Sequence, residues 1–174
     1  MGVYEVGHLI VQARQLARDY YQSTGKSLPG ISAELARYDA ASQLNLVLTE
    51  DPNCGYDALS REQPAQRLQI RGRVIFDPEK VNQRVGQLRL QKPWDGAVLV
   101  LMDPLFEATE MFIAVRQVIE EAAAETSAKR RAKGVLSVSK FRRLGRLVWS
   151  RETGRIDGSI WCPDGESSPE RVGR

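Results

Sequence analysis

The sequence predicts an α/β fold in which a mixed β-sheet is flanked by helices. Three observations carry this prediction: helical apolar spacing at the start of the chain, a group of short strand patterns in the middle, and one long helical pattern near the end. The apolar run AVLVLM at 97–102 has no polar interruption, which is typical of a strand buried on both faces.

Two helices are expected first. Apolar residues recur at helical spacing over 4–22, which indicates an amphipathic helix that ends in the glycine- and proline-containing segment STGKSLPG. Ser32 is expected to cap a second helix that runs to about Leu44. The apolar stripe of the first helix consists of Val6, Leu9, Ile10, Ala13, Leu16, Ala17 and Tyr20.

After the second helix we expect several strands, a third helix, a last basic helix or turn, and a tail. The segment 116–133 predicts a helix that ends at Gly134, and Ser137 or Ser139 can cap a last basic helix or turn. Residues 1–150 are predicted to form a single domain, and the Gly-, Ser- and Pro-rich segment 151–174 a poorly ordered tail. The predicted strands are LNLVLT (44–49), GYDAL (55–59), RLQIRGRVIF (67–76), AVLVLM (97–102) and TEMFIAV (109–115).

Composition excludes several classes of protein. The 174 residues are 42% hydrophobic and 27% charged, as in an ordinary globular domain. No apolar run approaches the ~20 residues of a membrane span, and no secretory leader pattern opens the chain. The two separated cysteines, Cys54 and Cys162, and the single histidine, His8, argue against a zinc site or a Cys/His nucleophile pair. We therefore expect a reducing, cytoplasmic location.

Positive charge is concentrated near the end of the chain. Between Lys129 and Arg151 there are nine lysine or arginine residues and no acidic residue. Such a block is typical of a nucleic-acid partner, and Phe141 and Trp149 stand among the charges where they could stack on bases. The alternative is that these cations cap a helix C-terminus and coat a solvated helix. The predicted DNA contacts are Lys129, Arg130, Arg131, Lys133, Lys140, Arg142, Arg143 and Arg146.

One strand pattern carries polar residues that indicate chemistry. A hairpin of GYDAL and QRLQIRGR with its turn centred near Gln63 places Asp57 opposite Gln69, with Arg71 two residues further on the same face. Oxygen ligands for a hard cation next to a positive side chain suit Mg²⁺-dependent phosphodiester hydrolysis. The alternative is that Gln69 and Arg71 are ordinary polar groups of an edge strand. Asp95 and Asp103, at the ends of the AVLVLM strand, are expected to act as strand-end caps.

The residues GYDAL, LQIRGR and Glu34 in ISAELARYDAASQL resemble the core of the PD-(D/E)XK, or restriction-endonuclease-like, nucleases. The chain is more narrowly similar to small bacterial proteins with a Gly-Tyr-Asp-Ala and Gln-Ile-Lys-Gly-Arg core. The resemblance extends through KPWDGAVLVLMD and GVLSVSKFRRLGRLVW, and so covers most of residues 4–149. It implies a mixed sheet flanked by helices and DNA as the substrate.

The resemblance also implies roles for four residues. Asp57 corresponds to the metal-binding aspartate, Gln69 to the second acidic ligand, Arg71 to the lysine, and Glu34 to a helix glutamate that often completes metal binding. In an active enzyme Asp57, Gln69 and Glu34 would hold Mg²⁺ or Mn²⁺, and Arg71 would stabilise charge on the phosphate. Gln69 can still offer a carbonyl oxygen, but Arg71 is not equivalent to lysine in size, pKa or reach.

Several functions therefore remain open from sequence alone. The first is a Mg²⁺-dependent DNA endonuclease, and the second is a nucleic-acid-binding protein with a degenerate site. A homodimer is compatible with both. A third is a helix-turn-helix regulator, because SAELAR and SQLNLVL scan as two short helices, although the second lacks the basic residues that read DNA. A protein-interaction module that uses the alanine-rich helix after Arg116 is a fourth.

Overall fold

A computed structural model gives the fold and describes residues 2–80, 83–128 and 136–156. The described helices are α1 (Val3–Thr24), α2 (Ile31–Leu44), α3 (Arg116–Ala124) and α5 (Val138–Leu144). The described strands are β1 (Val47–Leu48), β2 (Ala58–Leu59), β3 (Arg67–Val74), β4 (Gly96–Met102), β5 (Ala108–Val115), β6 (Arg146–Ser150) and β7 (Gly154–Arg155).

The described strands form one mixed sheet in chain order, β1 to β7. Strands β3 and β4 run parallel, and every other neighbouring pair is antiparallel. The expected mixed sheet is therefore confirmed. All residues of β4 are buried, as its unbroken apolar sequence predicts. Strand β3 lies between β2 and β4, but β2 pairs only with Arg67 and Leu68, so Gln69 and Arg71 lie where that pairing has ended. Gln69 is nevertheless buried and is not an ordinary solvated edge residue.

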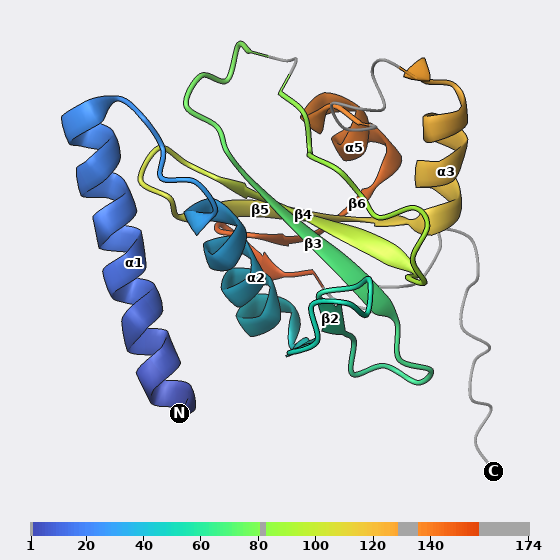
Figure 1. Cartoon of the computed structure of the whole chain (residues 1–174), viewed down its shortest axis with the longest axis horizontal. Helices are drawn as coiled ribbons and strands as arrows, with labels where there is room; N and C mark the ends of the chain where they lie inside the picture. The colour runs from blue at the N-terminus through green and yellow to red at the C-terminus, as the bar shows by residue number, and fades with distance from the viewer. Residues whose placement is uncertain (1, 81–82, 129–135, 157–174) are drawn as a thin grey trace.

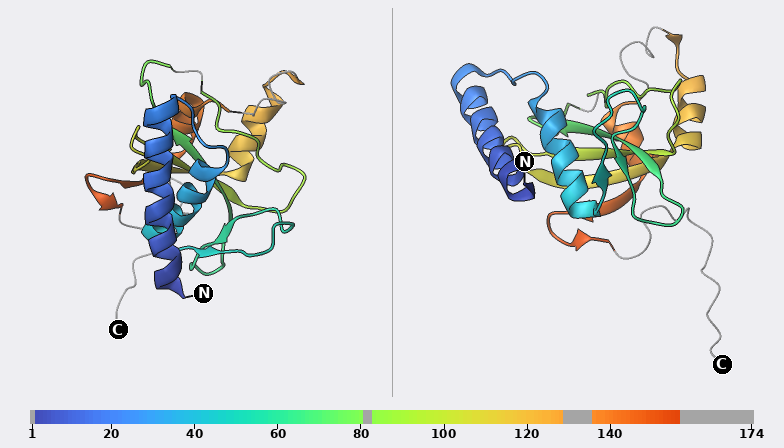
Figure 2. Two further views of the ribbon diagram at one scale, coloured as in Figure 1. Left: turned by 60° about the vertical axis from the view of Figure 1, so that its left-hand side comes forward. Right: turned by 60° about the horizontal axis from the view of Figure 1, so that its bottom comes forward.

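Helices cover both faces of the sheet (Figure 1), and each face has its own hydrophobic core. On one face α2 packs against Leu68 and Ile70 of β3, and α1 packs outside α2 (Figure 2). On the other face, α3, α5 and Trp94 cover Leu99 of β4. The apolar side of β3 thus faces α2, and its polar side faces the second layer.

Helix α1 confirms the predicted helix at 4–22, but it uses only part of the predicted apolar stripe. Ala17 is fully buried, and Ile10 and Ala13 pack against the same core. Fewer apolar residues are buried than predicted because α1 contacts the rest of the domain through only one of its faces. On that face Arg14 pairs with Asp39 of α2 at 2.7 Å. The exposed members of the stripe are Val6, Leu9, Leu16 and Tyr20.

Helix α2 differs from its prediction at its start and contradicts the helix-turn-helix alternative. Gly30, with φ of 80°, is the N-cap residue in place of Ser32, because glycine adopts this left-handed conformation without steric cost. The segment from Ile31 to Leu44 is one continuous helix and is followed by strand β1. The alternative prediction of two short helices joined by a turn is therefore wrong for this segment.

The region after β5 also needs correction. Helix α3 ends at Ala124, because the backbone N–H and side chain of Thr126 bond to carbonyls of the last helical turn. Residues 129–134 of the predicted helix lie outside the described residues. Ser137 caps α5 by accepting a hydrogen bond from the N–H of Lys140 at 3.2 Å, as predicted. Strand β7 pairs with β6, so the sheet continues past the predicted domain end at residue 150. Residues 157–174 of the predicted tail lie outside the described residues.

No helix among the described residues is both long enough and apolar enough to cross a membrane.

Candidate functional site

The structure brings Asp57, Gln69 and Arg71 together where β2 and β3 pair. Ala58 pairs with Leu68 and Leu59 with Arg67. Asp57 directly precedes β2, so the same register places it opposite Gln69 and confirms the pairing predicted from a turn centred near Gln63. Residues directly opposite one another project from the same face of a sheet.

Asp57 makes its contacts through both main chain and side chain. Its N–H donates to the carbonyl oxygen of Leu68 at 2.8 Å, which continues the strand pairing. Its Oδ2 atom accepts the N–H of Ile70 at 2.7 Å and the Nη1 group of Arg71 at 3.2 Å. The carboxylate therefore satisfies a β3 backbone donor at the point where pairing with β2 stops.

Gln69 is held by hydrogen bonds at both ends of its amide. Its Oε1 atom accepts from Nη2 of Arg71 at 3.0 Å and from the N–H of Arg89 at 3.2 Å. Its Nε2 group donates to the carbonyl oxygen of Gly55 at 2.9 Å. The side chain is only 1% exposed, so both acceptor positions of its oxygen are used inside the protein.

Arg71 spans the other two residues and is fixed by further carbonyls. Its Nε group donates to the oxygen of Gln87 at 2.9 Å, and its Nη1 group donates to the oxygen of Ile70 at 2.7 Å. Burial lowers the pKa of the Arg71 guanidinium, and the Asp57 carboxylate opposes that shift. An arginine pKa starts so high that the group stays charged at neutral pH.

Glu34 reaches the site only through Arg37. The Glu34 side chain is 66% exposed, and its Oε1 atom lies 3.4 Å from Nη1 of Arg37 one helical turn later. Arg37 in turn approaches Asp57, with 3.8 Å between Nε and Oδ1, and donates to the carbonyl of Thr49 at 3.2 Å. Sequence reasoning missed Arg37, although its position three residues after Glu34 on one helix predicts a shared face.

The position of α2 depends on Gly72. A Cβ atom at this glycine would lie 2.5 Å from the Cβ atom of Ala36 and 2.9 Å from the carbonyl oxygen of Ser32. The missing side chain lets the first turns of α2 lie directly on β3. This close approach carries Glu34 and Arg37 to the site.

The polar face of β3 is covered by another segment of the chain and is not open to solvent. The segment 83–90 crosses it, and its carbonyl oxygens accept hydrogen bonds from the arginines: Arg71 donates to Gln87 and Arg73 donates to Arg84 at 2.6 Å. Burial lowers the pKa of Arg73, and the neighbouring Arg71 charge adds to the effect. Arg89 belongs to the same segment and was also missed from sequence, because no local pattern shows where an irregular connection folds back.

Asp95 and Asp103 act as strand-end caps, as expected, and lie outside the site. Asp95 accepts the N–H and the guanidinium of Arg67 at 2.7 to 3.0 Å. These hydrogen bonds hold the pKa of Asp95 below its usual value. Asp103 accepts the N–H groups of Leu105 and Glu107 in the turn after β4.

The site residues do not fit a divalent cation. Gln69 has no free acceptor position, Oδ2 of Asp57 already accepts two N–H groups, and Glu34 points to Arg37. No group of three or more His, Cys, Asp or Glu side chains in the described part of the chain could hold a metal ion. A divalent ion about 4 Å from one guanidinium would also meet a repulsion of about 8 kcal/mol at an effective dielectric constant of about 20.

The predicted DNA contacts are only partly described. Lys129, Arg130, Arg131 and Lys133 lie outside the described residues. Among the rest, Lys140 lies 3.7 Å from Glu125, and Arg142 pairs with Glu110 at 3.2 Å and stacks over Phe112. Arg146 also makes an interaction within the described structure. Arg143 is exposed and has no polar partner among the described residues.

The expected stacking aromatics are corrected by the structure. Phe141 is 0% exposed and Trp149 is 8% exposed, and both belong to the hydrophobic cores. Their apolar neighbours explain the difference, because each faces the sheet interior and not the basic surface of α5. They are therefore not available to stack on bases.

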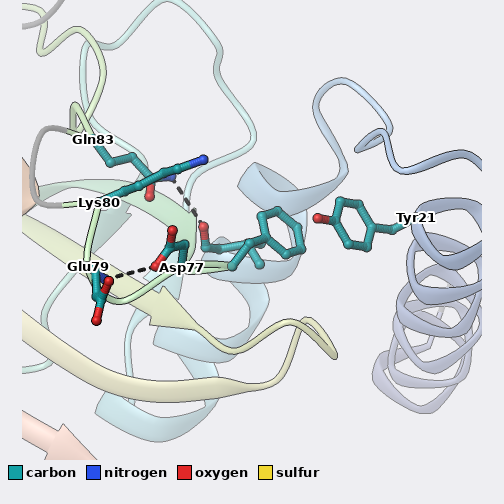
Figure 3. A pocket seen from close by; sticks show the side chains of 7 residues that line it. Tyr21, Asp77, Glu79, Lys80 and Gln83 are labelled. Atoms are coloured by element: carbon teal, nitrogen blue, oxygen red, sulfur yellow. Dashed lines mark hydrogen bonds between the residues drawn. The ribbon is translucent and has the colours of Figure 1, made fainter.

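A separate cavity of about 680 Å³ lies beyond the carboxyl end of β3 (Figure 3). Tyr21 of α1 lines one side, where its ring stacks on Phe76 with centroids 4.0 Å apart. Asp77, Lys80 and Gln83 line the opposite side. None of the four predicted catalytic residues, Glu34, Asp57, Gln69 and Arg71, lines this cavity.

A search of protein-family models and a search of curated proteins both find no match to this sequence.

Proposed function

We propose that this chain is a DNA-binding protein with a restriction-endonuclease-like fold, and that its site binds without cutting. The observation that carries the proposal is the convergence of Asp57, Gln69 and Arg71 at the β2–β3 pairing, in the order that the resemblance implies. The mixed sheet with helices on both faces agrees with it. Fold likeness alone does not define an activity, so the site chemistry decides between binding and cleavage.

The site favours binding over hydrolysis. Metal-dependent cleavage needs free oxygen ligands for the ion, but the oxygen of Gln69 and Oδ2 of Asp57 are occupied by N–H groups, and Oδ1 of Asp57 faces the Arg37 guanidinium at 3.8 Å. A guanidinium is also too weak an acid to exchange protons with an attacking water near neutral pH.

Positive charge supports DNA as the partner. The block from Lys129 to Arg151 lacks acidic residues, and one of its exposed members, Arg143, has no polar partner among the described residues. Each cation that neutralises a phosphate releases a counterion, so affinity should fall steeply with salt. We place this DNA-binding function in the cytoplasm.

The test is a binding and cleavage assay with labelled duplex, single-stranded and branched DNA. We expect salt-sensitive shifts with at least one of these forms, and intact DNA after prolonged incubation with Mg²⁺ or Mn²⁺. Failure to bind all three forms would contradict the proposal as a whole. Metal-dependent products that disappear in Asp57→Asn would instead show that the chain is a nuclease.

A further inference from the structure

A single guanidinium joins the two residues that a metal ion would join in the resembled site. Nη1 of Arg71 lies 3.2 Å from Oδ2 of Asp57, and Nη2 lies 3.0 Å from Oε1 of Gln69. The planar fork of arginine matches two oxygen acceptors at once. We propose that Arg71 is a built-in cation that replaces a divalent metal ion at this site.

The guanidinium is held in this place from several directions. The carbonyl oxygens of Gln87 and Ile70 accept its remaining bonds at 2.9 and 2.7 Å. Its side chain is 21% exposed. Swinging out would break hydrogen bonds to four oxygen acceptors at once, those of Asp57, Gln69, Ile70 and Gln87. The cation is therefore a permanent part of the fold, unlike an exchangeable ion.

The glutamine at position 69 matches an arginine better than a metal. Its Nε2 group donates to the carbonyl oxygen of Gly55, which a carboxylate could not do. Charge agrees with this reading: one carboxylate, that of Asp57, balances one guanidinium, whereas two carboxylates suit a divalent ion. Glutamine in place of the acidic ligand and arginine in place of lysine are thus explained together, as the replacement of a metal ion by a guanidinium.

This inference rests on the proposed function, because it assumes that the site is related to a metal-dependent nuclease site. Its test measures cation binding and does not depend on DNA binding. Mn²⁺ binding to the full chain is measured by calorimetry and by the paramagnetic resonance signal of free Mn²⁺. The variants are Gln69→Glu/Arg71→Lys, Arg71→Lys, and the matched control Arg73→Lys on the same strand. Circular dichroism establishes that each variant is folded.

We expect no saturable Mn²⁺ binding in the natural sequence or in Arg73→Lys, and binding about tenfold or more above that background in the double variant. Adding Asp57→Asn to the double variant should abolish the gain. If the double variant does not fold, Arg71→Lys replaces it, because this change leaves the Gln69–Gly55 hydrogen bond in place.

Two outcomes would overturn the inference. One is saturable Mn²⁺ binding by the natural sequence that Asp57→Asn removes. The other is a folded lysine variant with no gain. DNA affinity in EDTA is measured on the same samples. A loss of DNA binding there would end the proposed function while the Mn²⁺ results still decide the role of Arg71.

Discussion

The Oδ2 atom of Asp57 accepts the backbone N–H of Ile70 at 2.7 Å and, from the other side, the guanidinium of Arg71 at 3.2 Å. One carboxylate oxygen therefore closes the gap where β2 leaves β3 and also neutralises a largely buried cation. This double contact gives Asp57 a structural role that a purely catalytic carboxylate would not have. Removing it should affect folding as well as binding.

Asp57→Ala is expected to lower the free energy of unfolding by about 2 kcal/mol, because it leaves the Ile70 N–H and the Arg71 guanidinium without their acceptor. Urea denaturation at neutral pH measures the change. Asp19→Ala on the exposed side of α1 is the matched control, with an expected change below about 0.5 kcal/mol. Equal stability of the two variants would contradict the structural role of Asp57.

Gly72→Ala is expected to destabilise the domain by about 1–3 kcal/mol, because its methyl group would collide with Ala36 and the backbone of Ser32. The melting temperature gives the readout. Gly2→Ala serves as control, since no atom lies within 4 Å of the added carbon. If both variants melt alike, α2 does not lie directly on β3.

The Arg67–Asp95 pair predicts a pH dependence on the acid side. Hydrogen bonds from Arg67 hold the folded-state pKa of Asp95 below 3.8, so its ionised form stabilises the fold above that pH. This contribution is lost as the pH falls from 3.8 through the lower folded-state pKa. Asp95→Asn should therefore cost stability near neutral pH, and its difference from the natural sequence should shrink below pH 3.8. Urea midpoints across this range test it, and a constant difference would refute it.

Among the predicted DNA contacts that the structure describes, Arg143 is exposed and has no polar partner. Arg143→Ala should weaken binding severalfold and reduce the salt slope of log affinity by about one, as expected for the loss of one phosphate contact. Arg142→Ala should change the slope less, because Arg142 is paired with Glu110. Fluorescence anisotropy across a salt series measures both slopes. An unchanged slope in Arg143→Ala would remove α5 from the DNA interface.

Local sequence signals predicted the hairpin and its register well. The alternation in QRLQIRGR and the turn between it and GYDAL are short-range features, so they placed Asp57 opposite Gln69 correctly. The buried strand from Gly96 to Met102 was equally predictable, because its apolar run is unbroken, and the end of the second helix at Leu44 was also predicted.

The rest depends on contacts between distant segments. Nothing near Arg71 and Arg73 shows that the segment 83–90 folds over them and accepts their hydrogen bonds. Trp149 is buried because its strand pairs with β5. The basic residues next to it in the sequence give no sign of this pairing. Tertiary structure also decides which part of the α1 stripe is covered.

The most direct measurement compares the affinity of the natural chain for one labelled DNA duplex in EDTA and in Mn²⁺ at fixed ionic strength, with the same DNA analysed for cleavage. We expect equal affinity in both buffers and intact DNA, because Arg71 supplies the positive charge at Asp57 and Gln69. Tighter binding in Mn²⁺ together with cleavage products would contradict it.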